Sequence, residues 1–194
     1  MGETKPKLPR AERRAQILDA ATPIFANSGY AATSLEGIAE AAGISRVILY
    51  RHFAAKPELF RAVLEHAGEG LAAAAGEELT ESSIHSLVTW AYRNPAAFRL
   101  LFEQASREPE FRHEINELRD EMTRHVHDHL AEVITDERWA RWAARLSLTV
   151  AIDATMTWLD VGSPEPDLAA RRIDQVVQAV LTVVTGPESR PAES

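Results

Sequence analysis

Cysteine is absent from this chain of 194 residues. Disulfide frameworks, thiolate-ligated zinc sites and cysteine nucleophiles are therefore excluded, and a reducing cytoplasm is the simplest expected location. Long apolar runs are missing too, because no stretch approaches the ~20 residues that a membrane-spanning helix needs. The polar start MGETKPKLPR has no apolar core of the kind found in secretory signals. We expect a cytoplasmic protein without a membrane partner.

Common catalytic motifs are also missing. The chain has no phosphate-binding glycine loop, no nucleophile elbow, no HExxH and no paired Glu-x-x-His ligands. We therefore expect neither an enzyme nor a bound cofactor. Sustained alternation of apolar and polar residues is scarce as well, whereas apolar residues three and four apart recur in segments rich in Ala, Leu, Glu and Arg. This spacing predicts an all-α fold.

Positive charge is scarce overall but is not evenly distributed. The net charge is −8, yet the part through Glu65 has nine Lys and Arg against seven Asp and Glu. The rest of the chain has twelve Lys and Arg against twenty-two Asp and Glu. The sequence is therefore a mildly basic head on an acidic body, and the head is the part suited to a nucleic-acid partner.

Caps, glycines and prolines divide the chain into about nine helices. The expected spans are 10–27, 33–42, 45–53, 56–78, 82–93, 95–106, 109–134, 137–161 and 166–185. We expect a capping box at Thr33-Ser34-Leu35-Glu36 and an N-cap at Ser45. The expected domains are a disordered basic tail (1–8), a three-helix DNA-binding head (9–55), a larger body (56–185) and a disordered tail (186–194).

The second and third helices form a helix-turn-helix. Ala39 permits a close crossing, Gly43 supplies the positive φ of a tight turn, and Ile44 and Leu49 hold the next helix at a steep angle. The outward face of that helix then carries donors that suit phosphates and base edges. These outward residues are Ser45, Arg46, Tyr50, Arg51 and His52.

Residues 10–64 resemble the N-terminal DNA-binding domain of the TetR family of bacterial transcriptional regulators. The resemblance rests on residues at the family spacing: Phe25, Gly29-Tyr30, Thr33-Ser34, Ile38-Ala39, Gly43-Ile44-Ser45, Leu49-Tyr50-Arg51-His52-Phe53, Lys56 and Leu59-Phe60. The sequence departs from the family at Val47-Ile48, where many relatives have a small residue followed by threonine. An apolar contact by Val47, for example to a thymine methyl group, would replace the missing hydroxyl contact.

The resemblance implies a role for each matched residue. Thr33, Ser34, Tyr50, His52 and Lys56 are expected to contact phosphates. Ser45, Arg46, Val47 and Arg51 are expected to face the major groove. Arg46 is the candidate base contact, because a guanidinium can bind guanine O6 and N7 together. Arg10, Arg13 and Arg14, with Lys5 and Lys7, are candidates for the flanking backbone.

The body is expected to pair two chains, because one helix-turn-helix makes too few contacts for useful specificity. The last two helices are more apolar than single solvent-facing helices need to be, so two copies could form a four-helix bundle. The alternative is that these faces fill the core of one chain. The expected interface residues are Trp139, Trp142, Leu146, Val150, Trp158, Ile173, Val176, Val177, Val180, Leu181 and Val184.

The resemblance also implies an effector pocket between the head and the pairing helices. Met and aromatic side chains there suit an apolar ligand, although any single one of them is more often ordinary core than a ligand contact. The expected lining is Trp90, Phe98, Leu101, Phe102, Met122, Val126 and Met156. His125 and His129 lie one helical turn apart and could share a metal ion with His113 or Asp128, which is an alternative to the apolar effector.

The expected function is therefore a homodimeric repressor that a small apolar or amphipathic ligand releases from a palindromic operator. Repression, as opposed to activation, rests on the resemblance alone. A helical adaptor that binds protein partners and no DNA is the alternative of a different class. The two differ in salt dependence, since only DNA binding should weaken steeply as salt rises.

Overall fold

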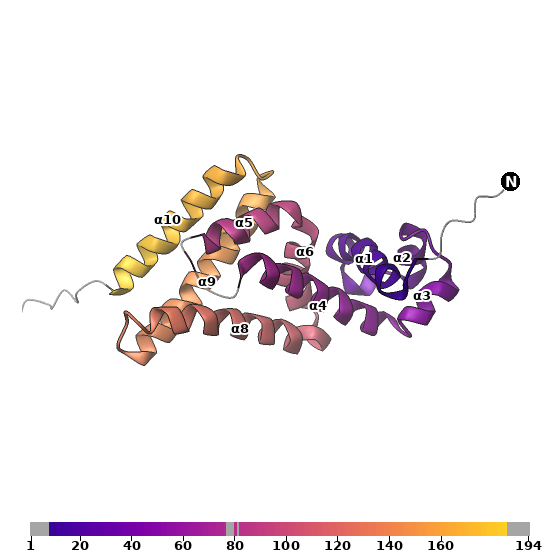
Figure 1. Ribbon diagram of the computed structural model, residues 1–194, viewed down its shortest axis with the longest axis horizontal. Helices are drawn as coiled ribbons and strands as arrows, with labels where there is room; N and C mark the ends of the chain where they lie inside the picture. Colours follow the sequence, from indigo (N-terminus) through magenta and orange to yellow (C-terminus); the bar gives the residue numbers. More distant parts are fainter. Residues whose placement is uncertain (1–7, 77–79, 81, 186–194) are drawn as a thin grey trace, which may run out of the picture. The chain divides into compact units, whose positions relative to one another are not determined.

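Figure 1 shows the computed structural model of the chain, which describes residues 8–76, 80 and 82–185, with side chains up to Val183. Every regular element in these ranges is a helix, and no strand occurs in them. When the continuous helical stretch 95–107 is counted once, this part of the chain contains nine helices. The predicted all-α class, the helix count and the N-terminal helix-turn-helix are confirmed. The two predicted tails fall almost entirely outside the described residues.

The chain forms two compact units. The first comprises Met1–Gly70 and Ala96–Ile115, and the second comprises Leu71–Pro95 and Asn116–Ser194. The predicted domain boundaries, 9–55 and 56–185, stay a prediction. Each unit has its own buried apolar residues, so each is described by itself below.

In the first unit, α1 (Arg10–Ala32) is interrupted at Gly29, whose φ of 74° and ψ of 169° are not helical. The first helix was predicted over 10–27, so its predicted end lies two residues before this break, and one more helical turn follows Gly29. Glycine accepts this positive φ at little cost because it has no Cβ. The buried side chains of α1 are Ile17, Leu18, Ala21, Phe25 and Ala26.

The two short helices are α2 (Leu35–Ala41) and α3 (Arg46–His52). Gly43, at φ 63°, makes the turn between them, and the amide of Ile44 donates to the carbonyl of Ala39 at 3.0 Å. The side-chain amide of Gln16 donates to the carbonyl of Ala42 at 2.9 Å, which ties the turn to α1. Leu49 is fully buried, so α3 is fixed by its inner face.

The predicted capping box at Thr33 and Glu36 is wrong. Ser34 is the N-cap of α2, and its hydroxyl accepts from the amide of Gly37 at 3.1 Å. Thr33 is buried and donates its hydroxyl to the carbonyl of Gly29 at 2.8 Å. The N3 position of a capping box would be Gly37, which has no carboxylate. The predicted N-cap at Ser45 is confirmed, because its hydroxyl accepts from Ile48 N at 3.4 Å.

The remaining helices follow the predicted spans closely. The helix α4 ends at Ala75, just before the residues that the structure does not describe, and α8 ends at Leu130, four residues before its predicted end. The stretch 95–107 is partly π-helical. The bounds are α4 Lys56–Ala75, α5 Ser83–Arg93, α6 Pro95–Arg99, the π-helix Leu100–Gln104, α7 Ala105–Arg107, the 3₁₀ turn Pro109–Phe111, α8 Arg112–Leu130, α9 Glu137–Asp160 and α10 Pro166–Thr185. Residues 77 and 78 of the predicted fourth helix lie outside the described residues.

The second unit is built on α5, α9 and α10, which pack on one another. A buried cluster of Leu130, Ile134, Ala140, Ala143 and Ala144 lies where the end of α8 meets the start of α9. The small alanines allow helices to approach closely, and Val126 and Leu181 pack against the cluster. This packing leaves the cavity that is described with the candidate site.

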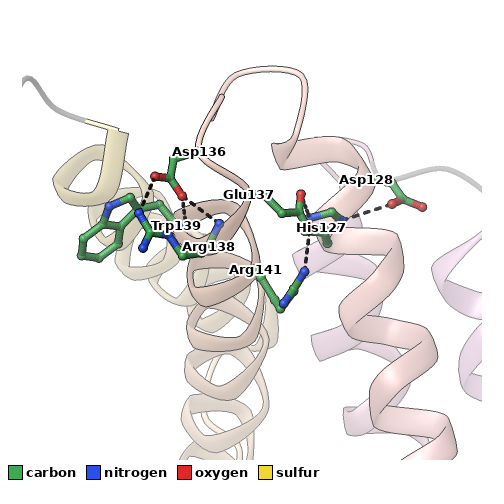
Figure 2. Close-up of polar contacts among 7 residues, drawn as sticks. All are labelled: His127, Asp128, Asp136, Glu137, Arg138, Trp139 and Arg141. Carbon is green, nitrogen blue, oxygen red and sulfur yellow. Dashed lines mark hydrogen bonds and ion pairs between the residues drawn. The ribbon is translucent and has the colours of Figure 1, made fainter.

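Polar contacts fix the junction between α8 and α9, as Figure 2 shows. Asp136 caps α9 by accepting from the amides of Arg138 at 2.9 Å and Trp139 at 3.4 Å. His127 Nε2 lies 3.2 Å from a Glu137 carboxylate oxygen, whose partner oxygen accepts from Arg141 at 2.7 Å. The junction is therefore set by groups that the sequence places ten residues apart.

Candidate functional site

The outer face of α3 carries the residues expected at DNA. Arg46, Val47, Tyr50 and Arg51 are exposed, with 61% of Val47 and 49% of Tyr50 accessible to solvent. Exposed large apolar groups are costly on a free helix, so their position beside two arginines is typical of a contact surface. We call Ser45, Arg46, Val47, Tyr50 and Arg51 the α3 surface.

Arg46 is held weakly. Its guanidinium lies 3.5 Å from the carboxylate of Glu36 on α2, and 68% of the Arg46 side chain and 43% of the Glu36 side chain are exposed. An ion pair this exposed contributes little, because water and salt screen it. The free energy needed to separate Arg46 from Glu36 is therefore small, so Arg46 can bind another anion instead. When no such anion is present, the negative charge of Glu36 disfavours binding of unrelated anions at this place.

Ser34 and Thr33 sit differently although they are neighbours. Ser34 is exposed at the N-terminus of α2 and uses one lone pair of its hydroxyl for Gly37 N, so the hydroxyl hydrogen remains for a phosphate. Thr33 is 5% exposed and its hydroxyl hydrogen goes to Gly29. The structure therefore brings Ser34 to the surface and leaves Thr33 inside, in contrast to the phosphate contact that the family resemblance implies for Thr33.

Lys56 is turned inward. Its ammonium donates to three backbone carbonyls, those of Tyr30 at 2.8 Å, Thr33 at 3.0 Å and Ala31 at 3.3 Å. It also lies 4.5 Å from the centre of the Tyr30 ring, a cation–π distance. An ammonium has three N–H donors, so all of them are used. We call this arrangement the Lys56 clasp, and it fixes the chain that leads into Ser34.

The ring of Tyr30 links the clasp to the core of the first unit. Tyr30 makes edge contacts with Phe60 at 5.0 Å and with Phe111 at 4.8 Å between ring centres. Burial raises the pKa of the Tyr30 phenol, with the charge of Glu110 as the next cause. The phenol is therefore neutral at physiological pH, and the ring serves packing and the lysine.

His52 ends α3 in a basic environment. Its pKa is lowered, first by burial and then by the charges of Arg10, Arg13 and Arg14. Arg14 also lies 5.3 Å above the ring of Phe53, the next residue. These three arginines belong to the first turns of α1, so α1 and α3 together gather positive charge at one place in an acidic protein. Such a cluster attracts polyanions.

A cavity of about 560 Å³ lies in the second unit, a volume typical of sites for drug-sized molecules. Its walls come from α4, α5, α8, α9 and α10. Most of the lining is apolar, and includes Leu71, Ile84, Leu87, Met122, Val126, Leu148, Val177 and Leu181. Ser147, Glu121, Asp174, His125 and His129 are among its polar members.

Of the seven residues expected to line an effector pocket, two line this cavity, Met122 and Val126. Phe98, Leu101 and Phe102 are buried in the first unit, where Phe98 and Phe102 contact each other at 4.8 Å. Trp90 and Met156 belong to the second unit but are not part of this lining. Ser147 lines the cavity and was not foreseen, since a single serine on a largely apolar helix gives a weak signal.

The histidine pair suggested as a metal site, His125 and His129, lies on the cavity wall. His125 is exposed and its Nδ1 lies 3.3 Å from the carbonyl of Glu121. Among the described residues, no group of three His, Cys, Asp or Glu side chains is placed to hold a metal ion. Neither His113 nor Asp128 therefore completes a site with this pair in the structure.

The expected pairing residues fall into two groups. Trp139, Trp142 and Val176 are about half exposed, and Leu146, Val150 and Val180 are partly buried. Trp158, Ile173 and Val177 are core residues of the second unit, and the Trp158 indole donates to the carbonyl of Pro164 at 2.8 Å. Leu181 packs on the α8–α9 cluster, and the Val184 side chain lies outside the described residues.

An open apolar groove runs along α9 and α10. It is lined by Trp142, Leu146, Val176, Ala179, Val180 and Val183, together with Arg172 and Gln175. Four of the expected pairing residues are therefore in one groove. Trp139 extends the apolar surface, because its ring meets that of Trp142 edge to face at 5.5 Å. We call these residues the α9–α10 face.

Within the described ranges, no helix combines the length and apolar character that crossing a bilayer requires.

Comparison with known proteins gives consistent matches for the first helices. The family model for bacterial regulatory proteins of the tetR family matches residues 17–63. The HTH-type transcriptional activator FasR of Mycolicibacterium smegmatis is 28% identical over 169 residues, or 81% of this chain and 77% of that protein. The HTH-type transcriptional repressor Rv3405c of Mycobacterium tuberculosis is 45% identical over 62 residues, or 32% of this chain and 33% of that repressor.

Solved structures share the fold across nearly the whole chain. A TetR-like transcriptional regulator from Rhodococcus sp. RHA1 superposes with a TM-score of 0.76 at 24% identity, covering 93% of this chain and 100% of that one. A transcriptional regulator from Aquifex aeolicus VF5 superposes with a TM-score of 0.74 at 18% identity, covering 87% and 99%. The helical body is thus similar in fold where sequence identity is low.

Proposed function

Because the chain belongs to the TetR family of bacterial transcriptional regulators and has its DNA-binding helix-turn-helix, we propose that it is a homodimeric repressor. A palindromic DNA operator is its target, and a small apolar or amphipathic ligand releases it. It works in the cytoplasm, where operators are found. The α3 surface is the single observation on which this function rests.

The proposed DNA contacts are Ser34, the α3 surface and His52. Arg46 reads a base and Val47 supplies an apolar contact beside it. The weak pairing of Arg46 with Glu36 supports this role, because the guanidinium is available at little cost. A bidentate contact of Arg46 with guanine is worth about 1–3 kcal/mol of discrimination. Thr33 and Lys56 act indirectly, by fixing the backbone that presents Ser34.

The proposed dimer joins two α9–α10 faces. The half-exposed Trp142 and Val176 support this, because a face with two tryptophans and several valines is costly to leave in water. Tryptophan is also common at the energetic centre of protein interfaces. Two copies place two α3 surfaces on one DNA, which accounts for a palindromic operator.

The proposed effector site is the cavity of the second unit. Its size and its apolar lining support binding of a small molecule that is largely buried. Burial is needed, since moving occupancy from almost fully bound to almost fully free takes a preference of about 5.5 kcal/mol for one conformer. Repression rather than activation is the proposal, and one relative above is named an activator and another a repressor.

Selection of bound sequences from random duplex DNA tests the function. We expect an inverted repeat to emerge, with affinity that falls steeply as salt rises. Arg46→Ala should relax preference at one symmetric pair of positions, at a cost of about 1–3 kcal/mol per site. Arg93→Ala, which removes an exposed arginine from α5 in the other unit, is the matched control and should change nothing.

Failure to enrich any sequence, even in dilute buffer, would leave the helical adaptor as the better reading. Where an operator is selected, expression of a reporter gene distinguishes a repressor from an activator. A reporter gene behind the selected operator should be expressed more strongly when the protein is removed.

A further inference from the structure

One polar atom in the cavity of the second unit is not used by the fold. Ser147 is 4% exposed, and its hydroxyl has no hydrogen-bond partner among the described residues. The other hydroxyl groups of the lining, those of Thr80, Ser83 and Thr182, all have partners. An unpaired buried hydroxyl is unfavourable, so a retained one calls for an explanation.

An unpaired hydroxyl is unusual for a buried serine inside a helix such as α9. A hydroxyl inside a helix commonly donates to the carbonyl four residues earlier, and Thr155 on the same helix does so to Ala151 at 2.7 Å. Ser147 does not make that bond, and it lines the cavity. Its hydroxyl is therefore available to a molecule in the cavity, as donor or acceptor.

The charges of the lining have one sign where they are fixed. Glu121 and Asp174 are both part of it, and no Lys or Arg is found among the described residues that line it. Glu121 is exposed and Asp174 is half-buried, whereas Ser147 is buried. The carboxylates are thus nearer to water than the hydroxyl. A cationic group near them is attracted, and an anionic group is repelled, with no Lys or Arg of the described lining to offset the repulsion.

We infer that the effector is an amphipathic cation: an apolar body, a neutral hydroxyl or carbonyl group that pairs with Ser147, and an ammonium group that the charges of Glu121 and Asp174 attract. This inference rests on the proposed function, because it names the ligand class of the proposed effector cavity. Fatty acids and other carboxylate amphiphiles are excluded from the class, although their tails would suit the walls.

Three probes with the same carbon chain separate these features. ω-Aminodecanol has a hydroxyl at one end and an ammonium group at the other, decylamine has only the ammonium group, and ω-hydroxydecanoate has the hydroxyl with a carboxylate. Calorimetric titration of each into the full chain gives affinities that do not depend on DNA. We expect ω-aminodecanol to bind at least about tenfold more tightly than ω-hydroxydecanoate, because charges of opposite sign meet only in the first.

Two variants test the residues. Ser147→Ala should weaken binding of ω-aminodecanol about fivefold, because the hydrogen bond to the hydroxyl group of this probe is lost. Binding of decylamine, which has no hydroxyl group, should be unchanged. Its thermal stability should not fall, because the removed hydroxyl is unpaired in the fold. The double variant Glu121→Gln with Asp174→Asn should weaken binding of both amines and strengthen binding of ω-hydroxydecanoate. Glu132→Gln, an exposed carboxylate outside the lining, is the control.

The inference is overturned if ω-hydroxydecanoate binds as well as ω-aminodecanol, if no probe binds, or if Ser147→Ala affects the two amines alike. DNA binding of the same samples, followed by fluorescence anisotropy without any probe, reports separately on the proposed function. A chain that binds DNA but not the amines remains a regulator with another ligand. A chain that binds the amines but no DNA duplex would support the inferred ligand class and contradict the proposed DNA operator.

Discussion

At the scale of single residues, a lysine in a DNA-binding domain can contact phosphate or stabilise the fold, and Lys56 shows how the two roles differ. A lysine that contacts phosphate releases counterions, whereas the Lys56 clasp uses all three donors on carbonyls of Tyr30, Ala31 and Thr33. We predict that Lys56→Met destabilises the protein by about 1–3 kcal/mol, because methionine retains the packing on Tyr30 but removes charge-assisted hydrogen bonds. Chemical denaturation measures this loss.

The salt dependence of DNA affinity decides between the two uses. If the clasp is structural, Lys56→Met lowers affinity equally for all sequences while the slope of log affinity against log salt stays the same. Loss of a phosphate contact would instead reduce that slope by about 1. Arg51→Gln is the comparison, because Arg51 is exposed on α3 and its removal should reduce the slope without changing stability.

His52 gives a prediction about pH. Burial and then Arg10, Arg13 and Arg14 lower the pKa of its imidazole in the free protein. The neutral form is thus favoured by folding, so the stability contributed is present above the unfolded pKa of about 6.5 and is lost as pH falls through the lower folded pKa. A nearby phosphate offsets the arginine charges and raises the pKa of His52 in the complex.

DNA binding should therefore take up a proton at His52, and affinity at constant salt should increase as pH falls from about 8 to about 6. His52→Gln should remove most of this increase, and anisotropy titrations across the pH range measure it. His66→Gln is the control within the same unit, since His66 belongs to α4 and pairs with Asp19 of α1 at 3.4 Å. An unchanged pH slope in His52→Gln would contradict the assignment.

At the scale of elements, local signals predicted what depends on neighbours in the sequence. The turn at Gly43 and the cap at Ser45 follow from the φ that glycine tolerates and from one hydroxyl three residues before an amide. The cap of α2 was predicted one residue early, because Thr33 and Ser34 both have hydroxyls. The carbonyl of Gly29, four residues back, takes the first and leaves the second as the cap.

Residues whose role depends on a distant helix were predicted less well. Helical periodicity shows that Phe98, Leu101 and Phe102 are apolar on one face, but it does not show which helix that face meets. All three are core residues of the first unit, not part of the cavity. The end of α8 is another case, because the pairing of His127 with Glu137 depends on how the chain turns between them.

At the scale of the whole molecule, regulation by a palindrome requires two chains, so the α9–α10 face can be tested directly. Val176→Asp places a carboxylate in the groove beside Trp142 and Val180. The new carboxylate loses its hydration at the interface, and Arg172 of the same groove offsets only part of that loss. Pairing should therefore cost about 2 kcal/mol or more, which raises the dimer dissociation constant about 30-fold. Sedimentation velocity over a range of protein concentrations measures this change.

Binding to DNA should change with pairing in a specific way. Val176→Asp should lose affinity for the full inverted repeat but retain that for a single half-site, because the α3 surface belongs to the other unit and is intact. Val161→Asp is the matched control, since Val161 is 68% exposed at the end of α9 and lies outside the groove. A wild-type chain that sediments as a monomer at micromolar concentration, or a Val176→Asp chain that pairs as tightly as Val161→Asp, would contradict pairing through the α9–α10 face.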